Sequence, residues 1–170
     1  MELATKLVRR PELDVALWLY TKTQPPQADW DAAIERIAFR FAPGAEQMLA
    51  HFRMVVITDG GAPNTMQRAQ LGRLLRGVRH KVSVITPPAP SAVMRGIMTA
   101  LAWINPSMVF FRPAQVREAL QHTDLLPMAS VLMAEFRALQ AQMPQVKTLA
   151  QVESELRRIA RRSQARPSLQ

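Results

Sequence analysis

One loop in the chain combines residue types that could bind an anionic group. Residues 58–65 read Thr-Asp-Gly-Gly-Ala-Pro-Asn-Thr, between a run that predicts a buried strand and one that predicts a helix. Two adjacent glycines let a backbone adopt positive φ and approach a ligand closely, and the amides that open a helix can bind an oxyanion. The following arginine falls about one turn into the helix. The candidate binding residues are therefore Asp59, Gly60, Gly61, Asn64, Thr65 and Arg68.

The same loop has a simpler interpretation, a tight turn in which Asn64 or Thr65 caps the helix. It matches neither a P-loop nor a dinucleotide-binding loop, because the required Gly-Lys-Ser/Thr or regularly spaced glycines are absent. A binding role would itself divide between contact with a protein and contact with a small ligand. The sequence leaves these alternatives open.

Catalytic and metal chemistry find little support in the residue pattern. Asp59 follows a strand, where open α/β sheets bind ligands, but the next carboxylate along the chain is Glu118. His51, His80 and His122 are not spaced as ligands, and there is no cysteine to act as a nucleophile or a metal ligand. We therefore predict a protein that is not an enzyme and that requires no metal or cofactor.

The middle of the chain carries positive charge without negative charge. No acidic residue lies between Asp59 and Glu118, and the basic residues of this stretch are Arg68, Arg73, Arg76, Arg79, Lys81, Arg95, Arg112 and Arg117. This pattern predicts a positive face and a protein partner with an acidic surface. The net charge of +9 divides into +5 for residues 1–126 and +4 for residues 127–170. Because this excess is spread along the chain, nucleic acid is the less favoured partner.

Composition also bears on where the protein works. The absence of cysteine fits a reducing compartment. The first residues lack the apolar segment of a secretory signal, and no window approaches about 18 uninterrupted apolar residues. We therefore expect a soluble, cytoplasmic protein without a membrane span.

Alternating strand and helix patterns must position these candidate residues. Apolar runs bounded by turn residues predict strands at 4–9, 15–21, 54–58, 81–86 and 108–111. Apolar stripes at helical spacing predict helices at 29–41, 65–76, 92–104 and 113–120, with a short helical turn near 48–49, a stop at Gly77 and a cap at Ser91. The first two strands should form a hairpin, and the alternating order that follows predicts a mostly parallel sheet with helices packed on it.

Two further features could frame a binding surface on this fold. The proline-rich loop at residues 87–90 should lie at the same sheet edge as the glycine loop, either as a docking groove or simply as a stiff connection. The helix that follows carries Trp103 and several methionines. Such a stripe is typical of a core, and an adaptable binding surface is the alternative.

Residues 127–170 form a different kind of sequence, a helical extension to an α/β domain at residues 1–126. An apolar stripe runs from Met128 to Met143, Pro144 interrupts it, and a second stripe follows at Leu149, Val152, Leu156 and Ile159. Two interpretations stay open: the helices pack back on their own domain, or they bind a partner or a second copy. The arginine-rich end is predicted to fray.

The order of elements resembles the STAS family of anti-sigma-factor antagonists and sulfate-transporter domains over about residues 4–126. The resemblance rests on the strand at 54–58 running into the Asp-Gly-Gly loop, and on residues 92–106, which are similar to small SpoIIAA-like proteins of myxobacteria. It implies a STAS-like α/β fold whose glycine loop contacts a partner. In the antagonists a serine that opens the following helix is phosphorylated. This chain has no serine there, and Thr65 is the candidate phosphorylation site.

Together these observations predict a non-enzymatic protein-interaction or regulatory module. It would dock an acidic partner through the loop at 59–65 and through Arg68, Arg73 and Arg76 on the next helix. The first alternative is a domain that binds a small anionic ligand, a nucleotide or a lipid. The second is a nucleic-acid-associated protein.

Overall fold

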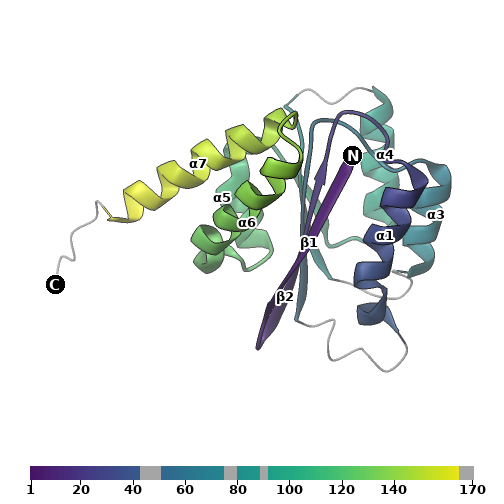
Figure 1. The fold of residues 1–170 in the computed structure, drawn as a ribbon, viewed down its shortest axis with the longest axis horizontal. Helices are drawn as coiled ribbons and strands as arrows, with labels where there is room; N and C mark the ends of the chain where they lie inside the picture. Colours follow the sequence, from purple (N-terminus) through teal and green to yellow (C-terminus); the bar gives the residue numbers. More distant parts are fainter. Residues whose placement is uncertain (43–50, 75–79, 89–91, 165–170) are drawn as a thin grey trace.

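The computed structural model describes residues 1–42, 51–74, 80–88 and 92–164. Within these ranges the chain forms one sheet with helices on both of its faces (Figure 1). The predictions for Arg76, Gly77, Ser91, the helical turn at 48–49 and the extreme end of the tail fall outside the described residues. The predicted α/β architecture, a mostly parallel sheet with a leading hairpin and a helical extension, is confirmed and is consistent with a STAS-like fold.

The five strands follow one another across the sheet in the order of the sequence. Strand β1 pairs antiparallel with β2, and each later strand pairs parallel with the one before it. The bounds are β1 Leu3–Arg10, β2 Leu13–Tyr20, β3 Phe52–Thr58, β4 Lys81–Ile85 and β5 Met108–Phe111.

The apolar run of β2 is continuous because both faces of the strand are covered. Leu17 and Leu19 belong to the core on one face, and Trp18 and Tyr20 belong to the core on the other. Alternation of side chains along a strand produces this division. A strand that is buried on both faces reads as an uninterrupted apolar run in the sequence.

Helices divide between the two faces according to their place in the chain. One face carries the helices that connect the strands, and the other carries the helices after β5 (Figure 1). The connecting helices are α1 Gln27–Ala38, α3 Thr65–Leu74 and α4 Ala92–Ile104, and the 3₁₀ turn η1 Phe39–Phe41 follows α1. The later elements are η2 Pro113–Gln115, α5 Val116–His122, η3 Leu126–Met128, α6 Ala129–Gln142 and α7 Lys147–Gln164.

This division follows from the handedness of parallel connections. Each connection from β2 to β5 advances one strand in the same direction. Because such crossovers are right-handed, helices that advance in one direction lie on one face. On the opposite face, α5 lies over β4 and β5, and the extension contacts β1 and β3.

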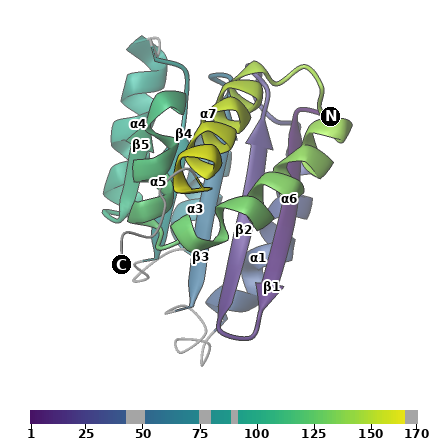
Figure 2. The same cartoon turned by 90° about the vertical axis from the view of Figure 1, so that its left-hand side faces the viewer.

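The described part of the extension, residues 127–164, packs on its own domain. Helix α6 lies over β1, α7 contacts β3, and α5 lies over β4 and β5 (Figure 2). Leu149, Val152 and Leu156 are buried in the same cluster as the residues of β2 and β3, and Ile159 packs against that cluster. The second apolar stripe of the extension is therefore used within the chain. No helix in the described part of the chain is long and apolar enough to cross a membrane.

Candidate functional site

The glycine loop is held mainly by bonds within the protein, beginning with Asp59. Its Oδ2 accepts a hydrogen bond from the backbone N–H of Lys147, and its Oδ1 accepts one from that of Thr148, each at 2.7 Å. These amides open α7, so the carboxylate caps that helix and its charge faces the positive end of the helix dipole. The candidate binding residue Asp59 thus joins the end of β3 to the helical extension.

Both glycines have a structural role within the turn. Gly60 has a φ of +111°, a conformation that favours glycine, and its N–H donates to Thr58 Oγ1 at 3.0 Å. Gly61 donates to the Thr21 carbonyl at 2.9 Å, and a Cβ at Gly61 would overlap the carbonyl oxygens of Thr21 and Thr23. The missing side chain of Gly61 therefore lets the loop approach the backbone that follows β2.

Asn64, rather than Thr65, caps α3. The Gln67 N–H donates to Asn64 Oδ1 and the Asn64 N–H donates to Gln67 Oε1, both at 2.9 Å. This is a reciprocal capping box. Arg68 donates to the Pro63 carbonyl at 2.7 Å and to Thr65 Oγ1 at 3.1 Å. Arg68 is thus turned back on the loop.

Two of the other predicted contacts lie at the surface of α3. Thr65 and Arg73 are exposed, while Arg76 lies outside the described residues. Of the predicted binding residues, Thr65, Arg68 and Arg73 therefore lie together on α3. The other predicted residues Asp59, Gly61 and Asn64 form hydrogen bonds within the protein.

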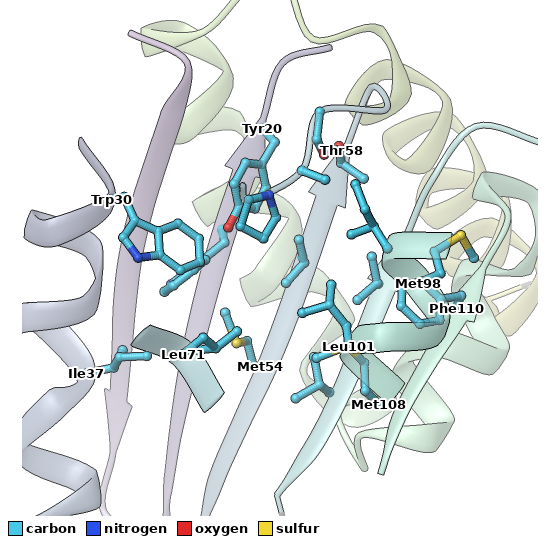
Figure 3. A pocket seen from close by; sticks show the side chains of 18 of the residues that line it. Tyr20, Trp30, Ile37, Met54, Thr58, Leu71, Met98, Leu101, Met108 and Phe110 are labelled. Atoms are coloured by element: carbon cyan, nitrogen blue, oxygen red, sulfur yellow. Dashed lines mark hydrogen bonds between the residues drawn. The ribbon is translucent and has the colours of Figure 1, made fainter. Parts of the chain in front are cut away.

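Behind the loop, between the sheet and the connecting helices, lies an apolar cavity of about 60 Å³ (Figure 3). We call it the cavity from here on. Trp30 and Ile37 from α1 lie on one side of it, and Met98 and Leu101 from α4 lie on the other (Figure 3). The complete lining is Trp18, Tyr20, Trp30, Ile37, Met54, Val56, Thr58, Gly61, Ala62, Pro63, Leu71, His80, Val82, Val84, Ile97, Met98, Leu101, Met108 and Phe110.

The sheet side of the cavity arises from strict alternation along four strands. Each strand contributes every second residue, such as Trp18 and Tyr20 on β2 or Met54 and Val56 on β3. The helix side is thinner, because Leu71 is the apolar residue of α3 that is fully buried among its described residues. The cavity therefore lies between a sheet face that is largely apolar and a helix layer in which α3 supplies few buried apolar side chains.

Most polar groups on the cavity wall are already satisfied. Thr58 Oγ1 donates to the Gly61 carbonyl at 2.7 Å, and Trp30 Nε1 donates to Gln70 Oε1 at 2.9 Å. Burial raises the pKa of the Tyr20 hydroxyl well above its usual value, so this residue is a neutral phenol.

His80 is the exception on this wall. Its side chain is 2% exposed and packs against the rings of Phe41 and Phe52, with centroid separations of 5.3 Å. Burial, and secondarily the charge of Arg53, lowers the pKa of His80 to about 4, so the ring is neutral at pH 7. Its Nδ1 has no hydrogen-bond partner among the described residues. Sequence reasoning missed His80 as a site residue, because a single histidine before a strand carries no spacing signal.

A second concavity lies on the outer side of the loop, which we call the strand-end cleft. It has a volume of about 590 Å³ and is lined by Asp59, by the predicted proline loop at Pro87 and Pro88, and by the start of α7. The glycine and proline loops therefore share one edge of the sheet, as predicted. At one end Glu2 accepts hydrogen bonds from the hydroxyls of Thr21 and Thr23, and these bonds lower its pKa.

Comparisons with known proteins assign no relative to this chain: no family model, curated protein or solved structure matches it. The STAS resemblance thus stays a prediction. Within the described residues, no cluster of three or more histidine, aspartate or glutamate side chains could hold a metal ion.

Proposed function

We propose that this protein binds a small, predominantly apolar molecule in the cavity between its sheet and the helices α1, α3 and α4. The observation that carries the proposal is the composition of the wall, in which aromatic, aliphatic and methionine side chains surround a few polar groups. Pockets for small molecules have this character. The proposal departs from the small anionic ligand that the sequence analysis gave as its first alternative, because the apolar wall favours a ligand with an apolar body over a nucleotide.

An empty space of this kind needs a physical explanation. Protein interiors pack as closely as organic crystals and hold few voids larger than a water molecule. At about 24 cal/mol per Å³, an unfilled cavity of about 60 Å³ costs about 1.4 kcal/mol of stability. A ligand that filled it would recover this energy.

The size of the cavity restricts the ligand. It is smaller than the roughly 150 Å³ cavity that holds a benzene molecule, so a ligand with an aromatic ring enters only when flexible side chains of the wall move. Three of its lining residues, Met54, Met98 and Met108, have flexible, polarisable side chains that adapt their shape to a ligand. Ile97 and Met98 are half-buried, so they join the cavity to the surface of α4 and mark the entry side.

Xenon is a suitable first probe, because it binds dry apolar cavities without any polar contact. Pressurised xenon should shift the methyl NMR signals of Met54, Met98 and Met108. In the variant Val84→Phe, a ring placed on the cavity wall should abolish these shifts. The matched control Val109→Phe adds the same ring at a position that is 36% exposed and outside the lining, and should preserve them. Equal shifts in both variants, or none in the wild type, would refute the proposal.

A second candidate function, docking of an acidic protein partner, is favoured by the outer surface of α3 and α4. Met66 on α3 and Trp103 on α4 are 76% and 82% exposed, and exposed aromatic and methionine side chains are typical of interface centres. The exposed Arg73 supplies positive charge on the same helix as Met66. Since Asp59 caps α7, and Asn64 and Arg68 are bonded within the loop and the start of α3, docking rests on the helix surface more than on the loop.

This candidate is tested on a purified partner, once one is isolated. Trp103→Ala should weaken its binding, and Arg73→Glu should both weaken binding and flatten its salt dependence. Arg137→Glu on α6, on the opposite face of the sheet, is the matched charge control. A partner that binds the first two variants as tightly as the wild type would exclude this surface.

A further inference from the structure

His80 gives the cavity one position with unused hydrogen-bonding capacity. Among the described residues, the buried atoms His80 Nδ1 and Thr86 Oγ1 have no hydrogen-bond partner. Of the residues that carry them, His80 is the one that lines the cavity. A polar atom that is buried without a partner destabilises the fold, so this position calls for an additional group.

A bound water molecule fits the position poorly. A buried water needs two to four polar partners. A water beside Nδ1 would leave the apolar side chains of the cavity wall without a partner, whereas a molecule with one polar group and an apolar body would contact both the ring nitrogen and these side chains.

We infer that the ligand of the cavity is a neutral molecule with one hydroxyl-type group, such as a small alcohol or phenol, which pairs with His80 Nδ1 while its apolar body contacts Met54, Val84 and Leu101. This inference rests on the proposed function. A hydroxyl suits a neutral imidazole because it can donate to the ring nitrogen or accept from it, whichever tautomer is present. A carboxylate without a paired cation would be costly to bury here.

Phenol and toluene make a matched pair of probes, because they differ by a hydroxyl in place of a methyl group. Both should shift the methyl signals of Met54, Met98 and Met108 if the cavity takes small molecules. With phenol alone, the ¹⁵N signal of His80 Nδ1 should move towards a hydrogen-bonded value. Because this readout uses the wild-type protein, it does not depend on any variant folding.

Substitution provides an independent readout of the same contact. His80→Leu removes both ring nitrogens and should weaken phenol binding about tenfold, with toluene affinity changed by less than about twofold. His80→Gln keeps a polar amide at the position and should retain part of the preference for phenol.

The outcomes separate this inference from the proposed function. Methyl shifts with both probes but an unmoved His80 signal would overturn the anchoring role and leave the cavity as an apolar site. Methyl shifts with neither probe would overturn the inference, and the absence of shifts with xenon as well would overturn the proposed function. A His80 Nδ1 signal that is already hydrogen-bonded without a probe would also overturn the inference, because the position would then be filled by water or by protein.

Discussion

The two faces of the sheet differ in how completely their side chains are packed. On the face covered by α5, α6 and α7, the buried apolar sheet residues are all aliphatic, and Leu17, Leu19, Val55 and Ile57 of the strands β2 and β3 are each 0% exposed, while Val8 on the edge strand β1 is 6% exposed. On the face covered by α1, α3 and α4, the sheet residues are larger and more varied, several are 5–8% exposed, and the cavity lies among them. The difference teaches that α5 and the extension fill the space over one face, while the connecting helices leave a cavity over the other, where we propose that a ligand binds.

Asp59 connects the two regions. Its backbone N–H donates to the Tyr20 carbonyl, and Tyr20 lines the cavity, while its side chain caps α7 on the other face. The loop that the sequence marked as a binding element therefore fastens the tightly packed layer to the strand ends. Its neighbours Gly61, Ala62 and Pro63 form one end of the cavity wall.

The largest effect should come from comparing matched leucines in the two helix layers. Leu149→Ala on α7, at 1% exposure, should lower the free energy of unfolding by about 3–4 kcal/mol. Leu101→Ala on α4, at 9% exposure beside an existing cavity, should cost about 2 kcal/mol, because its surroundings are less complete. Urea titrations would measure both. Equal losses would show that the two faces are packed alike.

Lowering the pH should weaken the cavity face through His80. The unfolded histidine has its ordinary pKa near 6.5 and the folded one titrates at about 4, so between these values the unfolded chain binds more protons. Stability contributed by the neutral ring is thus present above about pH 6.5 and is lost as the pH falls towards 4, by about 3 kcal/mol. Urea titrations at pH 7 and pH 4.5 would measure the loss.

His80→Leu is the control for this pH effect. It removes the buried titrating group and should reduce the difference between the two pH values. Some acid sensitivity should persist, because Lys81 and Arg53 lower the pKa of Asp124, and Arg137 and Arg157 lower the pKa of Glu153. An unchanged pH difference in the variant would assign the acid sensitivity to these carboxylates alone.

The sequence predicted the elements well because their signals are local. The run at residues 54–58, for example, lies within β3, and the interruption at Pro144 separates α6 from α7. The leading hairpin and the mostly parallel sheet followed from the alternating pattern. Whether the extension packed in cis was left open, since an apolar stripe such as that of Leu149 and Val152 is the same whether it meets its own sheet or a partner.

The candidate site was harder to predict from the sequence, since it depends on contacts between residues that are distant along the chain. Asp59 caps a helix that begins at Lys147, and no local pattern reports such a contact. The cavity exists because Trp30, Met54 and Leu101 converge without filling the space between them. Apolar residues at regular spacing predict that a core forms, but not that the core is incomplete.

Adding one methylene group to each face should sharpen the contrast. Val55→Ile enlarges a side chain on the closed face, at 0% exposure, and overpacking there should cost about 1–2 kcal/mol. Val84→Ile enlarges a side chain in the wall of the cavity and should be neutral or stabilising by up to about 1 kcal/mol, because the new group enters open space. Thermal unfolding of the two variants gives the comparison. Destabilisation by Val84→Ile as large as that by Val55→Ile would mean that the cavity has no room for a methyl group.

The smallest expected effect concerns the cap that fastens α7. Asp59→Ala leaves the amides of Lys147 and Thr148 without their acceptor and should lower the free energy of unfolding by about 1 kcal/mol, with faster hydrogen exchange in the first turn of α7. Thr65→Ala is the matched control, because that residue opens α3 without capping it and should change stability by less than about 0.5 kcal/mol. If the loop instead existed to bind a ligand, with its bond to α7 incidental, Asp59→Ala would leave exchange in α7 unchanged. If the first turn of α7 stayed protected in this variant, Asp59 would not be needed to hold α7, and the loop would again be favoured as a binding element.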